Sequence, residues 1–336
     1  MQYQNSKRDI IYPIVLAVVL VVGIFIGIRF GARTETPNLL VYPKTDKLSS
    51  VINYIQDEYV DTVSMSSLVE NTIPSILKNL DPHSVYIPAQ DFQSVNEPLE
   101  GGFDGIGIQF NMSNDTAVVV NTIPGGPSER LGILAGDRII TVNGRNIAGV
   151  KFQFDSIPRL LKGPTGTHVK VGIKRSEVKE LIDFDIIRDK IPINSVDVSY
   201  MINSEVGYIK ITTFAKTTYR EFLQGVEKLR GLGMKKLILD LRSNSGGYMD
   251  AATNIANEFL QKGQLIVYTQ GKNRARQDVY SNGAGTCQDL DLEILIDEFS
   301  ASASEILAGA VQDNDRGKII GRRSFGKGLV QEQIFF

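Results

Sequence analysis

The chain contains few of the side chains on which many metal sites and hydrolases depend. Its 336 residues include one cysteine, Cys287, two histidines, His83 and His168, and no tryptophan. A single cysteine excludes an intramolecular disulfide framework and any site with several thiolate ligands. A histidine-based zinc site or a Ser/His/Asp triad would have to use one of the two histidines. We therefore expect no metal site and look for chemistry in other residue types.

An excess of charge of either sign is also missing. The sequence has 36 basic and 38 acidic residues, which gives a formal net charge of -2. Nucleic-acid binding needs a broad electropositive surface, so we expect no nucleic-acid partner. With 42% apolar and 22% charged residues, the chain is long enough to bury more than one hydrophobic core.

A long apolar run lies near the N-terminus. Ile10 to Ile28 carries no charged residue and is about as long as a helix that crosses a bilayer. A cleavable signal peptide would have a shorter apolar core and small residues at its cleavage site, whereas Gly31 to Thr34 is a poor match. We expect an uncleaved transmembrane anchor within residues 1–33. Its short N-terminal head is expected in the cytoplasm, and the rest of the chain outside it.

After the anchor, the pattern of apolar residues changes twice. Residues 34–99 begin with a polar linker and continue with apolar positions at helical spacing, which predicts a short helical hairpin. Residues 100–188 alternate β-rich runs with turn residues, which predicts a small β-rich domain. Residues 189–336 alternate strands with helices, which predicts an α/β layer with a largely parallel sheet. Since the chain ends inside a strand-like run, we expect part of this sheet to be missing from the sequence.

The elements predicted in the last two regions follow from these patterns. The strands are Thr116–Thr122, Arg138–Val142, His168–Lys174, Val206–Ile211, Lys236–Leu241, Leu292–Ile296 and Lys318–Ile320, and the helices are Tyr219–Leu229, Asp250–Leu260 and Ala303–Val311.

Ser302 begins a predicted amphipathic helix directly after a buried strand. Ser302 and Glu305 have the S-x-x-E spacing of a capping box, so helix capping alone explains this serine. The same position lets exposed backbone N–H groups at a helix N-terminus stabilise an oxyanion. The two interpretations are compatible, and both stay open.

Lys327 lies in Gly321–Gly328, which nearly spells a phosphate-binding loop. Gly328 replaces the hydroxyl residue that would bind magnesium, and the residues that follow alternate like a strand rather than a helix. In a strand, Lys327 and Gln331 point to one face. A serine hydroxyl needs a base to become a nucleophile, and lysine can be that base when desolvation or positive charge lowers its pKa. A Ser302/Lys327 pair is therefore one interpretation, and an ordinary surface lysine is the other.

These residues resemble the carboxyl-terminal processing (tail-specific) peptidases of family S41, which are Ser/Lys serine proteases with a PDZ domain. The matching motifs are Leu239–Gly247, Ser300–Glu305, Asp313, Phe325–Gly328 and Gln331. The spacing agrees, with 25 positions from Ser302 to Lys327 and four from Lys327 to Gln331. The resemblance implies that Ser302 is the nucleophile, that Lys327 is the general base and that Gln331 orients the lysine. It gives Asp313 a supporting role.

The resemblance also assigns an oxyanion hole to backbone N–H groups. One donor is Ala303, and the other is in the glycine turn, where the choice between Gly246 and Gly247 stays open. A strand followed by a glycine-rich turn and a helix does present N–H groups at one edge of a sheet.

The β-rich region resembles a PDZ domain. The residues that carry this likeness are Phe103–Ile108, Val118–Val120, Gly132–Ile140 and Val142–Gly144. In such a domain, successive backbone N–H groups bind the terminal carboxylate of a peptide, and a neighbouring strand edge pairs with that peptide. The carboxylate-binding residues implied here are Gly105, Ile106, Gly107 and Ile108.

The expected fold is α/β, with a crotonase-like or ClpP-like peptidase core, an inserted PDZ domain, a helical N-terminal region and a membrane anchor. The expected boundaries are 1–33, 34–99, 100–188 and 189–336. The resemblance implies a serine endopeptidase without a cofactor, which cleaves extracytoplasmic proteins near their C-termini. It implies a place in the bacterial inner membrane, with the catalytic part on the periplasmic side. The expected partners are polypeptides with free C-termini and the membrane, and assembly into a homo-oligomer is left open.

Two other functions fit the same features. One is a membrane-tethered PDZ adaptor whose peptidase fold is inactive. The other is a hydrolase of this fold that acts on a small ester or amide.

Overall fold

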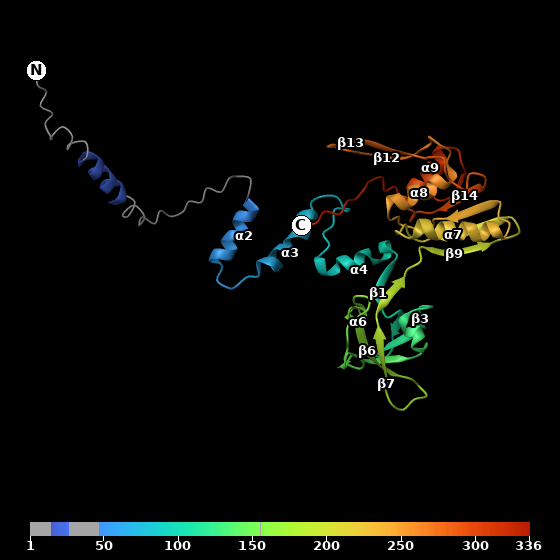
Figure 1. Cartoon of the computed structure of the whole chain (residues 1–336), viewed down its shortest axis with the longest axis horizontal. Coiled ribbons are helices and arrows are strands. Elements are labelled where there is room, and N and C mark those ends of the chain that lie inside the picture. Colours follow the sequence, from blue (N-terminus) through green and yellow to red (C-terminus); the bar gives the residue numbers. More distant parts are fainter. Residues whose placement is uncertain (1–14, 27–46, 155) are drawn as a thin grey trace, which may run out of the picture. The chain divides into compact units, whose positions relative to one another are not determined.

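The computed structural model describes residues 15–26, 47–154 and 156–336. The chain divides into two compact units, one ending at Tyr86 and one beginning at Ile87 (Figure 1). In the first unit, residues 15–26 are helical, and α2 (Lys47–Glu58) and α3 (Met65–Leu77) follow. The helical spacing therefore predicted α2 and α3 correctly, although neither helix has a fully buried residue.

The predicted transmembrane anchor, Ile10–Ile28, is described only from residue 15 to residue 26, and its two ends lie outside the described residues. Within the described ranges, no helix combines the length and the apolar character needed to cross a membrane. The anchor therefore stays a prediction from the sequence.

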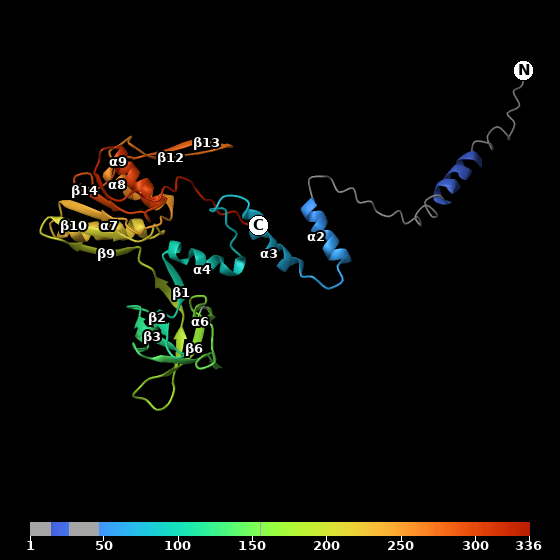
Figure 2. The same ribbon diagram turned by 180° about the vertical axis from the view of Figure 1, so that it is seen from behind.

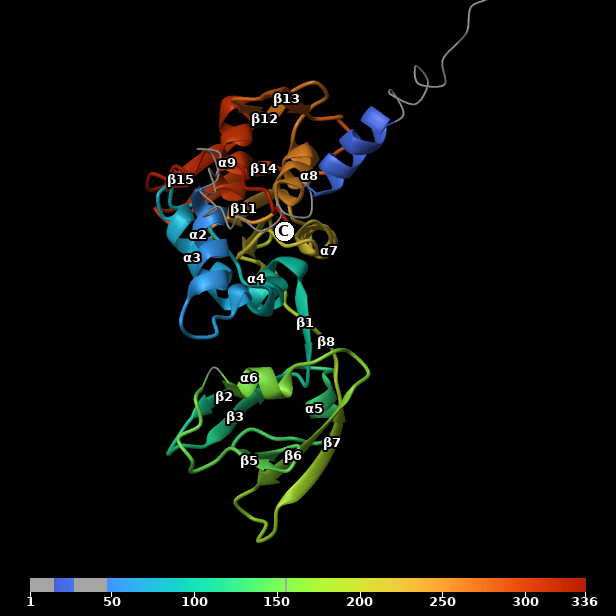
Figure 3. The same cartoon turned by 90° about the vertical axis from the view of Figure 1, so that its left-hand side faces the viewer.

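The β-rich region forms a sheet with its own hydrophobic core (Figure 3). Its strands are β2 (Ile108–Met112), β3 (Ala117–Thr122), β4 (Arg138–Val142), β5 (Arg145–Asn146), β6 (His168–Lys174) and β7 (Ile182–Ile187), and its helices are α5 (Pro127–Arg130) and α6 (Ser156–Leu161). The main order is β2-β3-β4-β6-β7, with every pair antiparallel and β5 beside β4. Strand β2 is therefore an edge strand of this sheet.

Two short strands carry the chain into and out of this region. Strand β1 (Gly102–Gly105) pairs antiparallel with β8 (Asp189–Pro192). Helix α4 (Ala89–Glu100) precedes β1 and ends at Gly101, whose φ of 75° is one that glycine adopts without strain. A side chain at Gly101 would also collide with Thr217, because its Cβ would lie 2.5 Å from Thr217 Oγ1. The sequence patterns did not predict α4 or the β1–β8 pair.

The C-terminal region is a five-stranded sheet covered by helices. The strands are β9 (Val196–Met201), β10 (Val206–Ile211), β11 (Lys236–Asp240), β14 (Asp291–Ile296) and β15 (Lys318–Gly321), and the helices are α7 (Thr218–Gly231), α8 (Met249–Phe259) and α9 (Ala303–Asp313). The order is β15-β14-β11-β10-β9, in which only β9 pairs antiparallel with its neighbour. The predicted α/β layer with a largely parallel sheet is confirmed.

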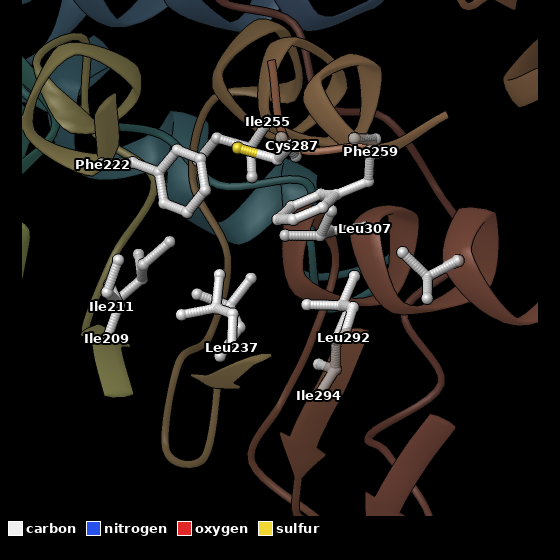
Figure 4. Close-up of a cluster of buried hydrophobic side chains, with 14 of the residues drawn as sticks. Ile209, Ile211, Phe222, Leu237, Ile255, Phe259, Cys287, Leu292, Ile294 and Leu307 are labelled. Atoms are coloured by element: carbon white, nitrogen blue, oxygen red, sulfur yellow. The ribbon is translucent and has the colours of Figure 1, made fainter. Parts of the chain in front are cut away.

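Figure 2 shows α7, α8 and α9 beside this sheet, and one apolar layer holds these helices on it (Figure 4). Strand residues such as Ile209, Leu237 and Ile294 pack against Phe222 of α7 and Phe259 of α8, all fully or almost fully buried. Because β10, β11 and β14 run parallel, their carboxyl ends meet at one edge of the sheet. The glycine turn (residues 241–247) follows β11 and the serine turn (residues 297–302) follows β14, so both turns lie at this edge.

Two features of this region differ from the prediction. Strands β12 (Leu265–Gly271) and β13 (Arg274–Tyr280) form an antiparallel hairpin that the sequence patterns did not indicate. The strand predicted from Leu329 to Phe336 is wrong, since the described residues after Gly321 contain no strand. Alternation of side chains is not enough for a strand, which also needs a hydrogen-bonded neighbour.

Candidate active site

Ser302 lies in the turn between β14 and α9, at the N-terminus of α9. Its φ is 55° and its ψ is -113°, a conformation that costs a non-glycine residue about 1–3 kcal/mol. Two hydrogen bonds hold this turn in place. The backbone N–H of Ala301 donates to the Asn244 carbonyl at 3.0 Å, and the Ser304 hydroxyl donates to the same carbonyl at 2.9 Å. The strain is thus maintained at the predicted nucleophile by its buried neighbours.

The Glu305 carboxylate joins the serine turn to the loop that carries Lys327. Its Oε2 accepts hydrogen bonds from the backbone N–H of Ser302 at 2.8 Å and from that of Lys327 at 2.9 Å. The two nitrogens therefore lie within about 6 Å of each other. Its Oε1 accepts from the Ser324 hydroxyl and the Gly326 N–H, both at 2.7 Å. Burial raises the pKa of Glu305, but these hydrogen bonds outweigh burial and hold the pKa below its usual value.

Lys327 is half-buried, and its Nζ donates a hydrogen bond to Gln331 Oε1. The prediction that these two side chains share a face is confirmed, although the segment is not a strand. A further bond, from the Phe325 N–H to the Ser300 carbonyl at 3.0 Å, fixes the lysine loop on the serine turn. The backbones of Ser302 and Lys327, which are distant in sequence, are therefore held close together.

The geometry of the glycine turn distinguishes Gly246 from Gly247. The Gly246 N–H donates to Asn244 Oδ1 at 2.9 Å, and the Gly246 carbonyl accepts from the Phe214 N–H at 2.9 Å. The C=O and N–H of a trans peptide point in opposite directions, so the Gly247 N–H points away from Phe214. A Cβ at Gly246 would lie 2.8 Å from the Cβ of Ser302, which shows how closely the two turns approach.

Two backbone N–H groups lie where the glycine turn and the serine turn come close together. Among the described residues, the N–H groups of Gly247 and Ala303 have no hydrogen-bond acceptor. The Gly246 N–H does have one. The arrangement therefore favours Gly247 over Gly246 as the partner of Ala303 in an oxyanion hole.

An ion pair between the buried Asp240 and the half-exposed Arg242 supports the start of the glycine turn. Asp240 is fully buried at the end of β11, where Arg242 contacts both of its oxygens and the Tyr208 hydroxyl donates to Oδ2 at 2.6 Å. Burial raises the pKa of Asp240, but these hydrogen bonds and the nearby Lys210 ammonium lower it overall to about 2. Burial and the bond to Asp240 raise the pKa of Tyr208 to about 12. Asp240 is therefore ionised at neutral pH and fixes the backbone at Arg242.

Asp297 makes a second connection between the two turns. Its Oδ1 accepts from the Ser243 N–H at 2.9 Å and from the Phe299 N–H at 3.0 Å. The Ser300 hydroxyl donates to the Leu241 carbonyl at 2.8 Å. Burial raises the pKa of Asp297, and the hydrogen bonds it accepts lower it by more, so the pKa lies below its usual value.

The other candidate residues lie away from Ser302. Asp313 is exposed at the last position of α9, about 16 Å from Ser302 along the helix axis. A supporting role for Asp313 would act through the helix rather than by contact. His168 lies on β6, where its Nδ1 is 2.8 Å from Asp185 Oδ1. In the described ranges, no group of three or more His, Cys, Asp or Glu side chains could hold a metal ion.

The sequence patterns missed several residues that build this site. The capping-box spacing predicted the bond from Glu305 to Ser302, but not the bonds to Ser324, Gly326 and Lys327. Asn244 stands two residues before Gly246, a spacing typical of a turn in which the Asn side chain accepts from the backbone. That signal could have identified Asn244.

The proposed carboxylate-binding loop has its carbonyl groups turned inward. The Ile106 carbonyl accepts from the N–H of Ser128 at 3.1 Å and from its hydroxyl at 2.6 Å, and the Gly107 carbonyl accepts from the Ile123 N–H at 2.9 Å. Since all peptide bonds here are trans, the N–H groups of Gly107 and Ile108 point the opposite way. They are placed at the start of the edge strand β2.

Comparisons with known proteins match this chain to a peptidase family and to PDZ domains. The model of peptidase family S41 matches residues 205–336, and a PDZ-domain model matches residues 118–175. The carboxy-terminal-processing protease of Bartonella bacilliformis is 33% identical over 298 residues, which are 87% of this chain and 68% of that protein. A "Probable CtpA-like serine protease" of Staphylococcus aureus is 35% identical over 288 residues, which are 85% of this chain and 57% of that protein.

One of the solved structures that are similar to this chain is a processing protease. The photosystem II D1 C-terminal processing protease is 26% identical, with 84% of this chain and 82% of that chain covered and a TM-score of 0.43. The likeness to the Bartonella protein extends over both the PDZ segment and the peptidase core, and it includes more than two thirds of that relative. This chain belongs to peptidase family S41, the family of the carboxy-terminal-processing serine proteases, and it carries a PDZ domain.

Proposed function

We propose that this protein is a serine endopeptidase that cleaves polypeptides near their C-termini, with Ser302 as the nucleophile and Lys327 as the general base. The observation that carries the proposal is the Glu305 carboxylate, because one of its oxygens accepts from the backbone N–H of both residues. The hydrogen bond from Lys327 to Gln331 gives the amine a defined direction. A lysine base also suits a chain with two histidines.

The proposed reaction has two halves. Lys327 takes the hydroxyl proton of Ser302 while Oγ attacks the carbonyl carbon of the scissile bond, and the N–H groups of Gly247 and Ala303 stabilise the oxyanion. The C–N bond then breaks, the leaving amine takes the proton from Lys327, and an ester remains on Ser302. Water attacks this ester, gives a proton to Lys327 and releases the acid, and the proton returns to Ser302.

The PDZ domain is proposed to select substrates with a free C-terminus. The outward N–H groups of Gly107 and Ile108 suit a terminal carboxylate, and the edge of β2 can pair with an extended peptide. The chain that precedes the captured tail would then reach Ser302.

We further propose that Ile10–Ile28 anchors the protein in the bacterial inner membrane, with the catalytic part on the periplasmic side. The support is the length and the lack of charge of this run. Fractionation of cells should find the chain in membranes after an alkaline wash, and protease added to spheroplasts should digest it. Recovery in the soluble fraction would contradict the anchor.

The catalytic proposal is tested by cleavage of a peptide with a free C-terminus. We expect Ser302→Ala and Lys327→Ala each to abolish turnover, and the amidated peptide to be a poor substrate for the unmodified protein. Lys318→Ala, which changes an exposed lysine on β15, is the matched control and should remain active. Turnover that survives in both active-site variants would overturn the proposal. Carboxylate-dependent binding without turnover would favour the inactive PDZ adaptor.

A further inference from the structure

Asn244 is a fully buried polar residue at the centre of the site, and it has no part in the reaction steps above. Its side chain bonds to two segments. Its Nδ2 donates to the Ile211 carbonyl at the end of β10 at 2.9 Å, and its Oδ1 accepts from the Gly246 N–H at 2.9 Å. The amide therefore ties the glycine turn to the sheet edge.

The backbone of Asn244 bonds to the third segment, which is the serine turn. Its carbonyl accepts from the Ala301 N–H at 3.0 Å and from the Ser304 hydroxyl at 2.9 Å. These two donors flank Ser302 in sequence. One residue thus connects the sheet edge, the glycine turn and the turn of the nucleophile.

Two successive peptides meet at Gly246, and different partners fix them. The Asn244 side chain holds the Gly246 N–H, which belongs to the peptide between Ser245 and Gly246. The Phe214 N–H and the Thr213 hydroxyl donate to the Gly246 carbonyl, which belongs to the peptide between Gly246 and Gly247, at 2.9 and 3.2 Å. The direction of the Gly247 N–H follows from the second peptide plane. Without the Asn244 side chain, the Gly246 N–H would lose its acceptor, and the Gly246 Cα that both planes share could move.

We propose that Asn244 is a positioning residue that sets the distance and direction between the two oxyanion donors, the N–H groups of Gly247 and Ala303. The proposal rests on the peptidase function proposed above. Asn244 touches neither substrate nor reacting atoms, and it acts through the two turns that it connects. Because oxyanion donors act on the transition state, their misplacement lowers kcat more than it changes KM.

The test compares Asn244→Asp and Asn244→Ala with the unmodified full-length chain. Aspartate keeps the oxygen that accepts from Gly246 but places a second oxygen against the Ile211 carbonyl, whereas alanine removes both bonds. We expect kcat to fall about ten- to hundredfold in both variants, with KM within about twofold. In Asn244→Asp, the ratio of its kcat to that of the unmodified protein at the same pH should recover as the pH falls, because the protonated acid regains a donor for Ile211.

A control separates positioning from loss of stability. Asn257→Ala removes an Asn side chain on α8 whose Oδ1 accepts from the Ser281 hydroxyl at 3.0 Å and from the Asn282 N–H at 2.9 Å. It should lower the Tm, as Asn244→Ala does, and leave kcat unchanged when all proteins are assayed well below their Tm.

A peptide aldehyde gives a second readout, because its adduct with Ser302 carries an oxyanion. We expect Asn244→Ala to weaken aldehyde binding by the same factor as kcat/KM, while peptide affinity in a Ser302→Ala background stays unchanged. If Asn244→Asp and Asn244→Ala both keep kcat and aldehyde affinity within about twofold, the proposed role of Asn244 is wrong. An unmodified protein that neither cleaves the peptide nor forms the adduct would overturn the peptidase function as well.

Discussion

The two oxygens of Glu305 accept four hydrogen bonds, three of them from backbone N–H groups of Ser302, Gly326 and Lys327. A neutral amide cannot replace this carboxylate, because its NH₂ group would face two of the donors. We expect Glu305→Gln to lower the free energy of unfolding by about 1–3 kcal/mol. It should also reduce kcat by separating the serine turn from the lysine loop.

Urea unfolding and peptide cleavage check this prediction. Glu298→Gln is the matched control, since Glu298 pairs with Arg322 at the surface and exposed pairs contribute little to stability. Equal effects of the two substitutions on stability would contradict the role given to Glu305.

Asp240 makes stability depend on pH. Its pKa in the folded protein, about 2, lies below the usual value of 3.8. The carboxylate therefore stabilises the fold at neutral pH, and this contribution disappears as the pH falls through the range between the two values. We expect Asp240→Asn to cost about 2 kcal/mol at pH 7 and the difference from the unmodified protein to shrink towards pH 2. Urea unfolding from pH 7 to pH 2.5 measures this, and a difference independent of pH would refute it.

Residue types, spacing and the resemblance to family S41 together predicted Ser302, Lys327 and Gln331 as site residues, but not the geometry around them. The positive φ of Ser302 has no sequence signal, because serine rarely adopts it and only the surrounding contacts stabilise it. Three of the four bonds of Glu305, those from Ser324, Gly326 and Lys327, join residues 19 to 22 positions apart, and such tertiary contacts have no local pattern. The choice of Gly247 over Gly246 needed the positions of Asn244 and Phe214.

At the scale of elements, the sequence predicted strands well where apolar residues alternate and a neighbour is present. The bounds of β4, β6 and β10 match the predicted runs. Hairpin β12–β13 was missed because most residues of β13 are exposed and polar, so they show no buried face. Helix α4 was missed although Phe92, Val95 and Leu99 have helical spacing, because most of its other residues are polar. The strand predicted from Leu329 onwards is the opposite error. Its side chains alternate as they do in a strand, but no described strand pairs with it.

Replacing either of two glycines beside the site with alanine should change the stability of the protein, in opposite directions for the two positions. Gly321 ends β15 with a φ of 133°, and a Cβ there would lie 1.9 Å from the Ile296 carbonyl oxygen of β14. Gly309 lies inside α9, where an added Cβ meets no atom within 4 Å. We expect Gly321→Ala to destabilise the protein by more than about 1 kcal/mol and Gly309→Ala to stabilise it by about 0.5–1 kcal/mol.

Thermal unfolding of both variants tests the packing of α9 and β15. A stabilising Gly321→Ala would mean that β15 does not approach β14 as described. A destabilising Gly309→Ala would mean that this position of α9 is more crowded than it is here.

At the scale of the whole chain, α4 contacts three parts of the unit that begins at Ile87. Glu97 pairs with Lys162 at the end of α6, Glu100 pairs with Lys216 and Tyr248 of the peptidase core, and Asn96 Oδ1 accepts from Gln333 Nε2 at 2.9 Å. The PDZ domain and the peptidase core have separate hydrophobic clusters. Polar contacts of α4 therefore contribute to joining two domains that do not share a core.

The Glu97–Lys162 pair is the most buried of these contacts, with side chains 9% and 33% exposed. Lys162 also lies 4.7 Å from the centre of the Phe103 ring. Removing the ammonium leaves a buried carboxylate without its partner, so we expect Lys162→Met to cost about 3 kcal/mol. Glu97→Gln should cost less, because Lys162 can still reach water.

A double variant tests whether the loss of stability in Lys162→Met comes from breaking the pair with Glu97. If it does, Glu97→Gln combined with Lys162→Met should be more stable than Lys162→Met alone, with a coupling of about 1–3 kcal/mol in urea unfolding. Arg274 and Glu332, which are 71% and 51% exposed, form the comparison pair, and their coupling should be much smaller than that of Glu97 and Lys162 because water screens exposed charges. Equal couplings would mean that burial adds nothing at α4. A small coupling for both pairs would leave the β1–β8 strands and the remaining contacts of α4 as the connection between the PDZ domain and the peptidase core.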